Sequence, residues 1–195
     1  MAISYPLALP TNIGIASIEL RAKNTVAVSM SPFTYKQQTQ SYDGEMWEAD
    51  ISLPPLNRDD AEAWISILMS LKGASGTFLL NDPSAKTVRG TATSAVITGA
   101  VGASSVGVVM TGTLKAGDYI QLGTASDATL HKVLQDQSGD GTLEIWPKLR
   151  KARSSVSADL TNSAGVFRLS ANETSWSVNN ASFFGISFGA MEVVG

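Results

Sequence analysis

Apolar and polar residues alternate along several stretches of the chain, and this period of two predicts β-strands. The clearest stretch is 46–53, whose apolar residues fall on one face: Trp47, Ala49, Ile51 and Leu53. Acidic and hydroxyl side chains occupy the other face, which is typical of a half-buried antiparallel strand. Residues 13–21 and 24–30 alternate in the same way, so we expect strands there as well.

One segment, residues 58–72, has the pattern of an α-helix. Pro54 and Pro55 end the preceding strand, because proline cannot donate a hydrogen bond to a sheet. Asn57 is a suitable N-cap, and acidic residues follow in the first turns, where the helix dipole favours negative charge. Apolar residues then recur at helical spacing, at Ala61, Trp64, Ile65, Leu68 and Leu71. Lys72 in the last turn and Gly73 after it provide the C-terminal stop.

The composition changes after Pro83. Residues 91–113 carry no charge and are rich in β-branched side chains, which favours a hairpin over a flexible linker. A turn leading into a strand is expected in 114–123, and a second hairpin is expected from 129–134 and 142–146. Alternation of the earlier kind returns from Val166 onwards.

These patterns predict a mainly β protein with one helix. Its core should consist of residues 1–86 and 166–195, and a small β-rich domain should be inserted at 87–165. Because the strands on either side of the insert belong to one core, the chain near 86 and the chain near 166 should lie close together. The insert carries a net charge of +1 and the remainder −4, which gives the whole-chain charge of −3.

Composition excludes several classes of function. The negative net charge does not suit a dedicated nucleic-acid binder. With no cysteine and a single histidine, the chain has no thiolate metal site, no cysteine nucleophile and no site that needs two histidines. No apolar run is long enough to span a membrane, and the first residues lack a signal-peptide pattern, so we expect synthesis in the cytoplasm and no membrane insertion. Charged residues make up only 16% of the chain, which favours a surface that a partner covers.

Candidate catalytic residues are few. His131 lies in an alternating strand, where a solvated or hydrogen-bonded role is expected, and no Gly-x-Ser-x-Gly elbow supplies a nucleophile. Glu48 and Asp50 share one strand face about 7 Å apart, which could suit glycosidase chemistry but is typical of a solvated sheet face. We therefore expect no enzyme activity and no catalytic residues.

Candidate ligand sites are equally weak. Residues 136–141 match the start of an EF-hand calcium loop, but Pro147 stands where the twelfth-position carboxylate belongs. Gly99, Gly102 and Gly107 lack the strand–turn–helix context of a dinucleotide site. We expect a hairpin turn at 136–141, a structural role for the three glycines, and no metal or cofactor. The basic run Lys148, Arg150, Lys151 and Arg153 predicts an exposed loop, or a contact with an acidic neighbouring subunit.

Several motifs resemble distal tail proteins and related minor tail-tip proteins of long-tailed (siphovirus-type) bacteriophages. Residues 42–58 combine a Trp47-containing strand with a Leu-Pro-Pro turn, and Ala61-Glu62-Ala63-Trp64 opens the helix. The helix is followed by Gly-Thr-Phe-Leu-Leu-Asn-Asp-Pro at 76–83. Residues 114–123 and 165–169 also resemble members of that group, so the resemblance covers most of the chain.

The resemblance implies an antiparallel β-barrel or sandwich core flanked by the helix, with 87–165 as an inserted β-barrel-like domain. It further implies a structural virion protein that forms a six-fold ring at the tail tip and joins the tail tube to the hub, baseplate and fibres. DNA would pass through such a ring only as cargo, so the residues that face the pore should be neutral or acidic. The alternative is a carbohydrate- or receptor-binding β module that uses exposed aromatic residues such as Trp146 or Trp176.

Overall fold

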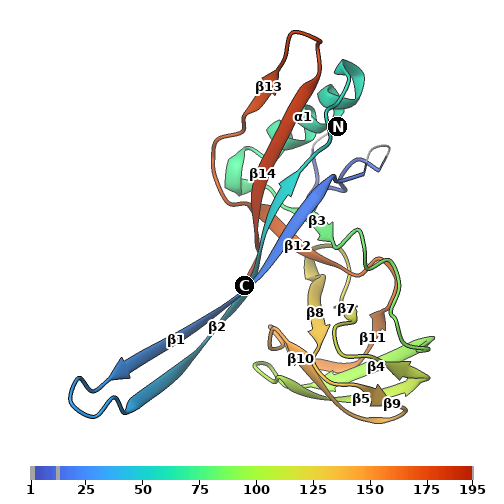
Figure 1. The fold of residues 1–195 in the computed structure, drawn as a ribbon. Helices are drawn as coiled ribbons and strands as arrows, with labels where there is room; N and C mark the ends of the chain where they lie inside the picture. The colour runs from blue at the N-terminus through green and yellow to red at the C-terminus, as the bar shows by residue number, and fades with distance from the viewer. Residues whose placement is uncertain (1–2, 12–13, 195) are drawn as a thin grey trace.

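The computed structural model describes residues 3–11 and 14–194. Residues 1–2, 12–13 and 195 fall inside the predicted core limits, and 13 also begins a predicted strand, but they lie outside the described residues. The chain is mainly β, as predicted, with antiparallel pairing between all of its named strands. It forms a central sheet with one α-helix, a closed barrel and a hairpin that projects from the sheet (Figure 1).

The central sheet is built from the two ends of the chain. Its strand order is β1-β2-β14-β12-β3, and β13 pairs with β14 off this path. The strands have the following bounds: β1 Ser17–Met30, β2 Gln37–Ser52, β3 Phe78–Asn81, β12 Ala164–Leu169, β13 Trp176–Val178 and β14 Phe184–Glu192. The alternation in 46–53 is confirmed, because Trp47, Ala49 and Ile51 are buried in β2 and Leu53 is buried just after it.

The predicted helix is present as α1, Arg58–Ser70. Asn57 caps it as expected, since its side-chain oxygen accepts a hydrogen bond from the Asp60 backbone N–H at 3.0 Å. The helix ends two residues earlier than predicted because Lys72 adopts a left-handed backbone, with φ of 52°, and Gly73 continues it with φ of 67°. A 3₁₀ turn, η1 Gly73–Ser75, then leads to β3.

The apolar face of α1 covers the sheet. Ala61, Trp64, Ile65 and Leu68 are buried there, and the Trp64 ring lies 6.1 Å from the ring of Phe188 in β14. Phe188 also meets Phe78 of β3 edge to face, with 6.2 Å between ring centroids. The helix therefore closes one side of the sheet over an aromatic core.

All six strands of the closed barrel lie between β3 and β12 in the sequence. The barrel order is β10-β5-β4-β11-β7-β8. These strands are β4 Ser94–Gly99, β5 Ser105–Thr111, β7 Tyr119–Leu122, β8 Thr129–Val133, β10 Gly141–Trp146 and β11 Arg153–Asp159. A small ladder joins β6 Thr113–Leu114 to β9 Gln137–Ser138, and η2 Ala125–Asp127 precedes β8.

The expected hairpin in 91–113 corresponds to β4 and β5. The second expected hairpin is only partly as predicted: β10 pairs with β8 at Ile145 and Trp146, but it pairs with β5 along Gly141–Glu144. This second pairing is what closes the barrel, and the local pattern of alternation contained no sign of it. The closed barrel thus lies in the inserted segment, while the rest of the chain forms an open sheet.

The chain enters and leaves the barrel at one place. The Asn162 backbone N–H donates to the Lys86 carbonyl oxygen at 2.8 Å, and Thr87 pairs with Thr161 in an isolated bridge. From there β12 returns to the central sheet beside β3. The barrel has its own cluster of buried side chains, while Tyr119, Leu130 and Trp146 pack toward the sheet instead.

Candidate functional site

The hairpin of β1 and β2 projects far beyond the sheet in which it begins (Figure 1). We call its outer part, residues 26–41, the arm. Ser31 is partly covered, and the other arm residues are exposed. A two-stranded hairpin is at best marginally stable alone in water. A covering surface would therefore stabilise the arm.

The two faces of the arm differ in chemistry. Val26, Val28 and Met30 share one face of β1 and are each more than half exposed, and their partners across the ladder are Ser41, Thr39 and Gln37. The opposite face carries small or amide side chains: Ala27, Ser29, Gln38 and Gln40. At the tip, Phe33 is 92% exposed and Tyr35 is 73% exposed. The arm thus presents an apolar stripe and a polar back.

The arm starts at an irregularity in the ladder. Asn24 pairs with Glu45, but Val26 already pairs with Ser41, so Thr25 faces three residues of β2. Gly44 fits there because a Cβ at this position would lie 2.5 Å from Oγ1 of Thr25. We call residues 24–25 and 42–45 the elbow. Such bulges bend a strand and change its twist, so the elbow sets a new direction for the arm.

The basic run after β10 forms the predicted exposed loop only in part: Lys151 is exposed, whereas Arg150 and Arg153 are largely buried. Arg150 reaches the carboxylate of Glu192, with 3.1 Å between Nη2 and Oε2, and only a small part of either side chain is exposed. Lys148 Nζ lies 2.8 Å from Asp43 Oδ1 at the elbow. The hydrogen bond between them lowers the pKa of Asp43 and raises the pKa of Lys148.

The other half of the run binds η2. Lys151 Nζ lies 2.9 Å from Asp127 Oδ1, and the buried guanidinium of Arg153 contacts Asp127 Oδ2. The hydrogen bonds from these two cations lower the pKa of the Asp127 carboxyl. The predicted exposed loop is therefore wrong for Arg150 and Arg153, because acids of the same chain neutralise the run.

His131 lies in β8, between β7 and β10, and is fully buried. Its Nδ1 lies 2.7 Å from the Pro147 carbonyl oxygen, which makes Nδ1 the donor, and its Nε2 lies 3.0 Å from Thr129 Oγ1. Burial lowers its pKa from 6.5 to about 4, so the ring is neutral at pH 7. Of the two expected roles, the hydrogen-bonded one is what the structure shows.

Glu48 and Asp50 face β1 on the outside of the sheet. Glu48 Oε1 accepts from Lys23 Nζ at 2.7 Å, and Asp50 Oδ2 accepts from Arg21 Nη2 at 2.5 Å. These are cross-strand pairs at diagonal positions in the ladder. Both carboxylates are thus engaged with β1, on a face that is open to solvent.

The stretch that resembled a calcium loop consists of the short strand β9 and the bend that leads from it into β10. Asp136 Oδ1 accepts from the Ala116 N–H at 2.7 Å, and Asp140 Oδ1 accepts from the Met110 N–H at 2.9 Å. Within the described part of the chain, no group of three or more histidine, cysteine or acidic side chains is placed to hold a metal ion. Gly99, Gly102 and Gly107 lie in and between β4 and β5, the first barrel hairpin.

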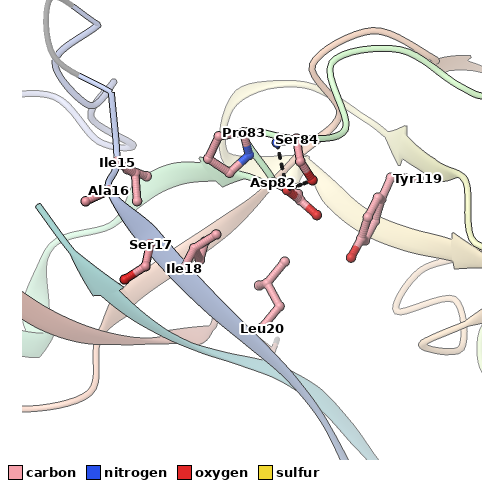
Figure 2. A pocket seen from close by; sticks show the side chains of 9 residues that line it. All are labelled: Ile15, Ala16, Ser17, Ile18, Leu20, Asp82, Pro83, Ser84 and Tyr119. Atoms are coloured by element: carbon pink, nitrogen blue, oxygen red, sulfur yellow. Dashed lines mark hydrogen bonds between the residues drawn. The ribbon is translucent and has the colours of Figure 1, made fainter.

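A cavity of about 370 Å³ lies where the start of β1 passes the end of β3 and Tyr119 of β7 (Figure 2). Figure 2 shows apolar side chains of β1 on one side and Asp82, Pro83 and Ser84 on the other. Asp82 Oδ1 accepts from the Ser84 backbone N–H at 2.9 Å and from its hydroxyl at 2.6 Å. This carboxylate therefore stabilises the turn that leads into the barrel.

The two tryptophans considered for carbohydrate binding have different environments. Trp146 is partly buried against Trp47, edge to face with 4.5 Å between ring centroids, and its indole N–H donates to Asn24 Oδ1 at 2.8 Å. Trp146 is therefore part of the contact between the barrel and the sheet. Trp176 in β13 is 44% exposed, and Val178 and Phe183 near it are exposed as well.

The sequence interpretation missed the arm as a surface. It predicted a strand at 24–30 but none at 37–45, because glutamine, threonine and serine dominate that stretch. One usable signal was present: Phe33 and Tyr35 stand in a short Pro-Phe-Thr-Tyr turn between two alternating segments. Large aromatic residues in a turn with no helix or strand to bury them indicate an exposed apolar tip.

The sequence matches no protein-family model and no curated protein. Among the described residues, no helix is both long and apolar enough to cross a lipid bilayer. A function must therefore be inferred from the arm, from the charge distribution and from the resemblance of the motifs.

Proposed function

We propose that this chain is a structural virion protein of a long-tailed bacteriophage, and that it forms a ring at the tail tip. The ring, of six copies, connects the tail tube to the hub, baseplate and fibres. The chain is made in the cytoplasm of the bacterial host and acts in the virion without enzymatic activity or cofactor. The number six and the neighbouring proteins come from the motif resemblance.

The arm is the observation that carries this proposal. It exposes Val26, Val28 and Met30 along one face and Phe33 and Tyr35 at the tip, in a chain with few surface charges. Exposed apolar patches of this kind mark interaction sites. An arm that reaches from one copy onto a different surface of the next makes a head-to-tail contact, and such contacts close into rings when the rotation allows it.

Edge strands support the same proposal. β1 is the outermost strand of the central sheet, so its outer backbone groups have no neighbouring strand in the described chain. At the other edge, β3 is covered in part by Leu7, whose backbone exchanges hydrogen bonds with the chain at Thr77 and Leu79. A long uncovered edge is an aggregation hazard in a monomer, and pairing between subunits removes it.

The test compares two neighbouring arm positions in the assembled tail. Val28→Glu places a charge on the apolar stripe, whereas Ser29→Glu, the matched control, places the same charge on the polar back. We expect a tail reconstruction to show six copies in a ring for the wild type and for Ser29→Glu, and loss of ring incorporation for Val28→Glu. A reconstruction with this chain as a lone subunit or a trimeric fibre contradicts the proposal.

The carbohydrate- or receptor-binding alternative now depends on Trp176, since Trp146 is engaged with Trp47 and Asn24. Its test is binding of the monomeric chain to a glycan array, with Trp176→Ala as the variant. Glycan binding that Trp176→Ala abolishes favours this alternative over the ring.

A further inference from the structure

Residues 146–150, the last residue of β10 and the segment that follows it, run along the elbow of the projecting hairpin. We call these residues the brace. Its residues alternate in burial: Pro147 and Leu149 are buried, whereas Trp146, Lys148 and Arg150 are only partly covered. This period of two means that one face of the brace points into the barrel and the other faces the hairpin.

The barrel side of the brace is firmly anchored. Leu149 is buried in the barrel core, and its backbone exchanges hydrogen bonds with the loop between β4 and β5. The Leu149 N–H donates to Ala103 at 2.9 Å, and the Leu149 carbonyl accepts from Gly102 at 2.7 Å. On the same side, the Pro147 carbonyl meets the buried His131 ring. The brace therefore moves with the barrel.

The other side of the brace contacts both strands of the hairpin. Trp146 Nε1 donates to Asn24 Oδ1 in β1 at 2.8 Å. In β2, the Lys148 backbone N–H donates to Glu45 Oε2 at 2.7 Å and Lys148 Nζ donates to Asp43 Oδ1 at 2.8 Å. Arg150 adds a hydrogen bond to the Glu45 carbonyl oxygen. All of these partners are elbow residues.

The position of these contacts matters because the elbow is where the hairpin ladder is irregular. A bulged two-stranded ribbon can bend there, and nothing else in the described chain hydrogen-bonds to the arm beyond it. A single exposed ion pair holds a side chain only weakly. Contacts to both strands, made by one segment fixed in a packed barrel, restrain rotation about the elbow as well as bending.

We infer that the brace is a positioning device: the barrel, through residues 146–150, fixes the direction in which the arm points. The inserted barrel thereby controls where the apolar stripe of the arm is presented. This inference concerns the single chain and does not depend on the proposed ring.

The test measures the arm direction in the full-length chain. Because the protein has no cysteine, Thr34→Cys at the arm tip and Ser138→Cys on the barrel give two unique sites for spin labels. Pulsed electron–electron double resonance then reports the distance distribution between them. The labelled chain is diluted in an excess of unlabelled chain, so that distances between copies do not contribute.

The brace variant changes only its elbow partners, as Asn24→Ala, Asp43→Ala and Glu45→Ala. The matched control also removes one amide and two carboxylates from the same hairpin, as Gln38→Ala, Glu48→Ala and Asp50→Ala. Glu48 and Asp50 bind cations of β1 and do not touch the brace. Circular dichroism and melting temperature establish that both variants fold.

We expect a narrow distance distribution for the parent and the control triple, and a wider, shifted distribution for the brace triple. Equal distributions in the two triples would overturn the inference, because the elbow would then hold its angle without the side chains that bind the brace. A broad distribution in the parent would also overturn it, since the brace would then not restrain the arm. If the brace triple behaves as expected while no ring forms in tails, only the proposed function fails.

Discussion

Two buried carboxylates, Asp118 in the barrel and Glu192 in β14 of the central sheet, are stabilised by different balances of burial and hydrogen bonding. Burial of Asp118 raises its pKa, but N–H groups of Lys115, Arg89 and Gly90 donate to the carboxylate, and together they bring the pKa below its ordinary value. Glu192 shows the opposite balance: burial raises its pKa more than Trp47 and Arg150 lower it. As the pH falls through these pKa values, Asp118 therefore destabilises the fold and Glu192 stabilises it.

His131 should make the fold sensitive to mild acid. Its folded-state pKa of about 4 lies below the ordinary value of 6.5, so the unfolded chain binds more protons between these values. The contribution of His131 to stability is thus fully present above pH 6.5 and is lost as the pH falls toward 4. The loss amounts to roughly 3 kcal/mol, because a shift of one pKa unit corresponds to ~1.4 kcal/mol. Urea unfolding of the wild type and His131→Gln between pH 4 and 7 measures this loss.

The variant comparison isolates the histidine. Glu192 stabilises the fold as the pH falls through its raised pKa, whereas Asp118 and Asp127 have lowered pKa values and act in the opposite direction. The wild-type profile alone therefore mixes the effect of His131 with those of these carboxylates. The glutamine side chain of the variant does not titrate, and its amide can still donate toward the Pro147 carbonyl. His131→Gln should lower stability at pH 7, because a fully buried ring is replaced. Its stability should decline less toward pH 4, because glutamine binds no proton. Parallel profiles for the two proteins would show that the ring is not buried in its neutral form.

At the scale of elements, the helix and the buried half of β2 follow from local rules. The Asn57 cap is a hydrogen bond within the first turn of α1. The apolar spacing in α1 and the alternation in 46–53 mark the sides of these elements that face the core. The arm could not be predicted in this way. Beyond the elbow no core is present, so the polar stretch of β2 has no side that must be apolar, and pairing with β1 determines its conformation.

Truncating the helix anchor should test the packing of α1 on the sheet. Trp64 is 1% exposed and packs near Phe188, and truncation of a buried tryptophan costs about 3–5 kcal/mol. Trp64→Ala should therefore unfold or aggregate the protein. The matched control, Met69→Ala, changes a side chain of the same helix that is 61% exposed, and its effect should stay within about 0.5 kcal/mol. Similar melting temperatures for the two variants would contradict the packing described for α1.

For the whole molecule, the sequence indicates where the inserted segment begins, but it does not indicate which residues of the barrel contact the hairpin. The contacts between brace and elbow join residues more than 100 positions apart, such as Lys148 with Glu45 and Trp146 with Asn24. Local patterns carry no information about such pairs. The basic run was therefore interpreted by its charge alone, as a loop or a contact with another subunit, although its acidic partners lie in the same chain.

The barrel should fold when it is separated from the sheet, but the sheet should depend on the barrel. The barrel segment, residues 87–163, contains all six barrel strands and its own apolar core, and its ends meet beside the hydrogen bond from Asn162 to Lys86. A segment of about 80 residues is large enough to fold alone. The central sheet loses more on separation, because Trp47 packs on Tyr119 and Trp146 and donates its indole N–H to the Leu130 carbonyl at 3.1 Å.

We therefore expect the isolated 87–163 fragment to show a β-type circular dichroism spectrum and cooperative urea unfolding. The chain without its barrel strands, with 88–161 replaced by a short Gly/Ser bridge, should keep β structure but unfold at a lower urea concentration than the full chain. The reason is that Trp47 becomes exposed and its N–H loses the Leu130 acceptor. Trp47→Phe should cost less in the bridged chain than in the full-length protein, because only the full-length protein has the Leu130 acceptor and the Tyr119 and Trp146 rings to lose. A disordered spectrum for the barrel fragment would mean that its strands close only against the sheet, and that the two parts form one continuous core.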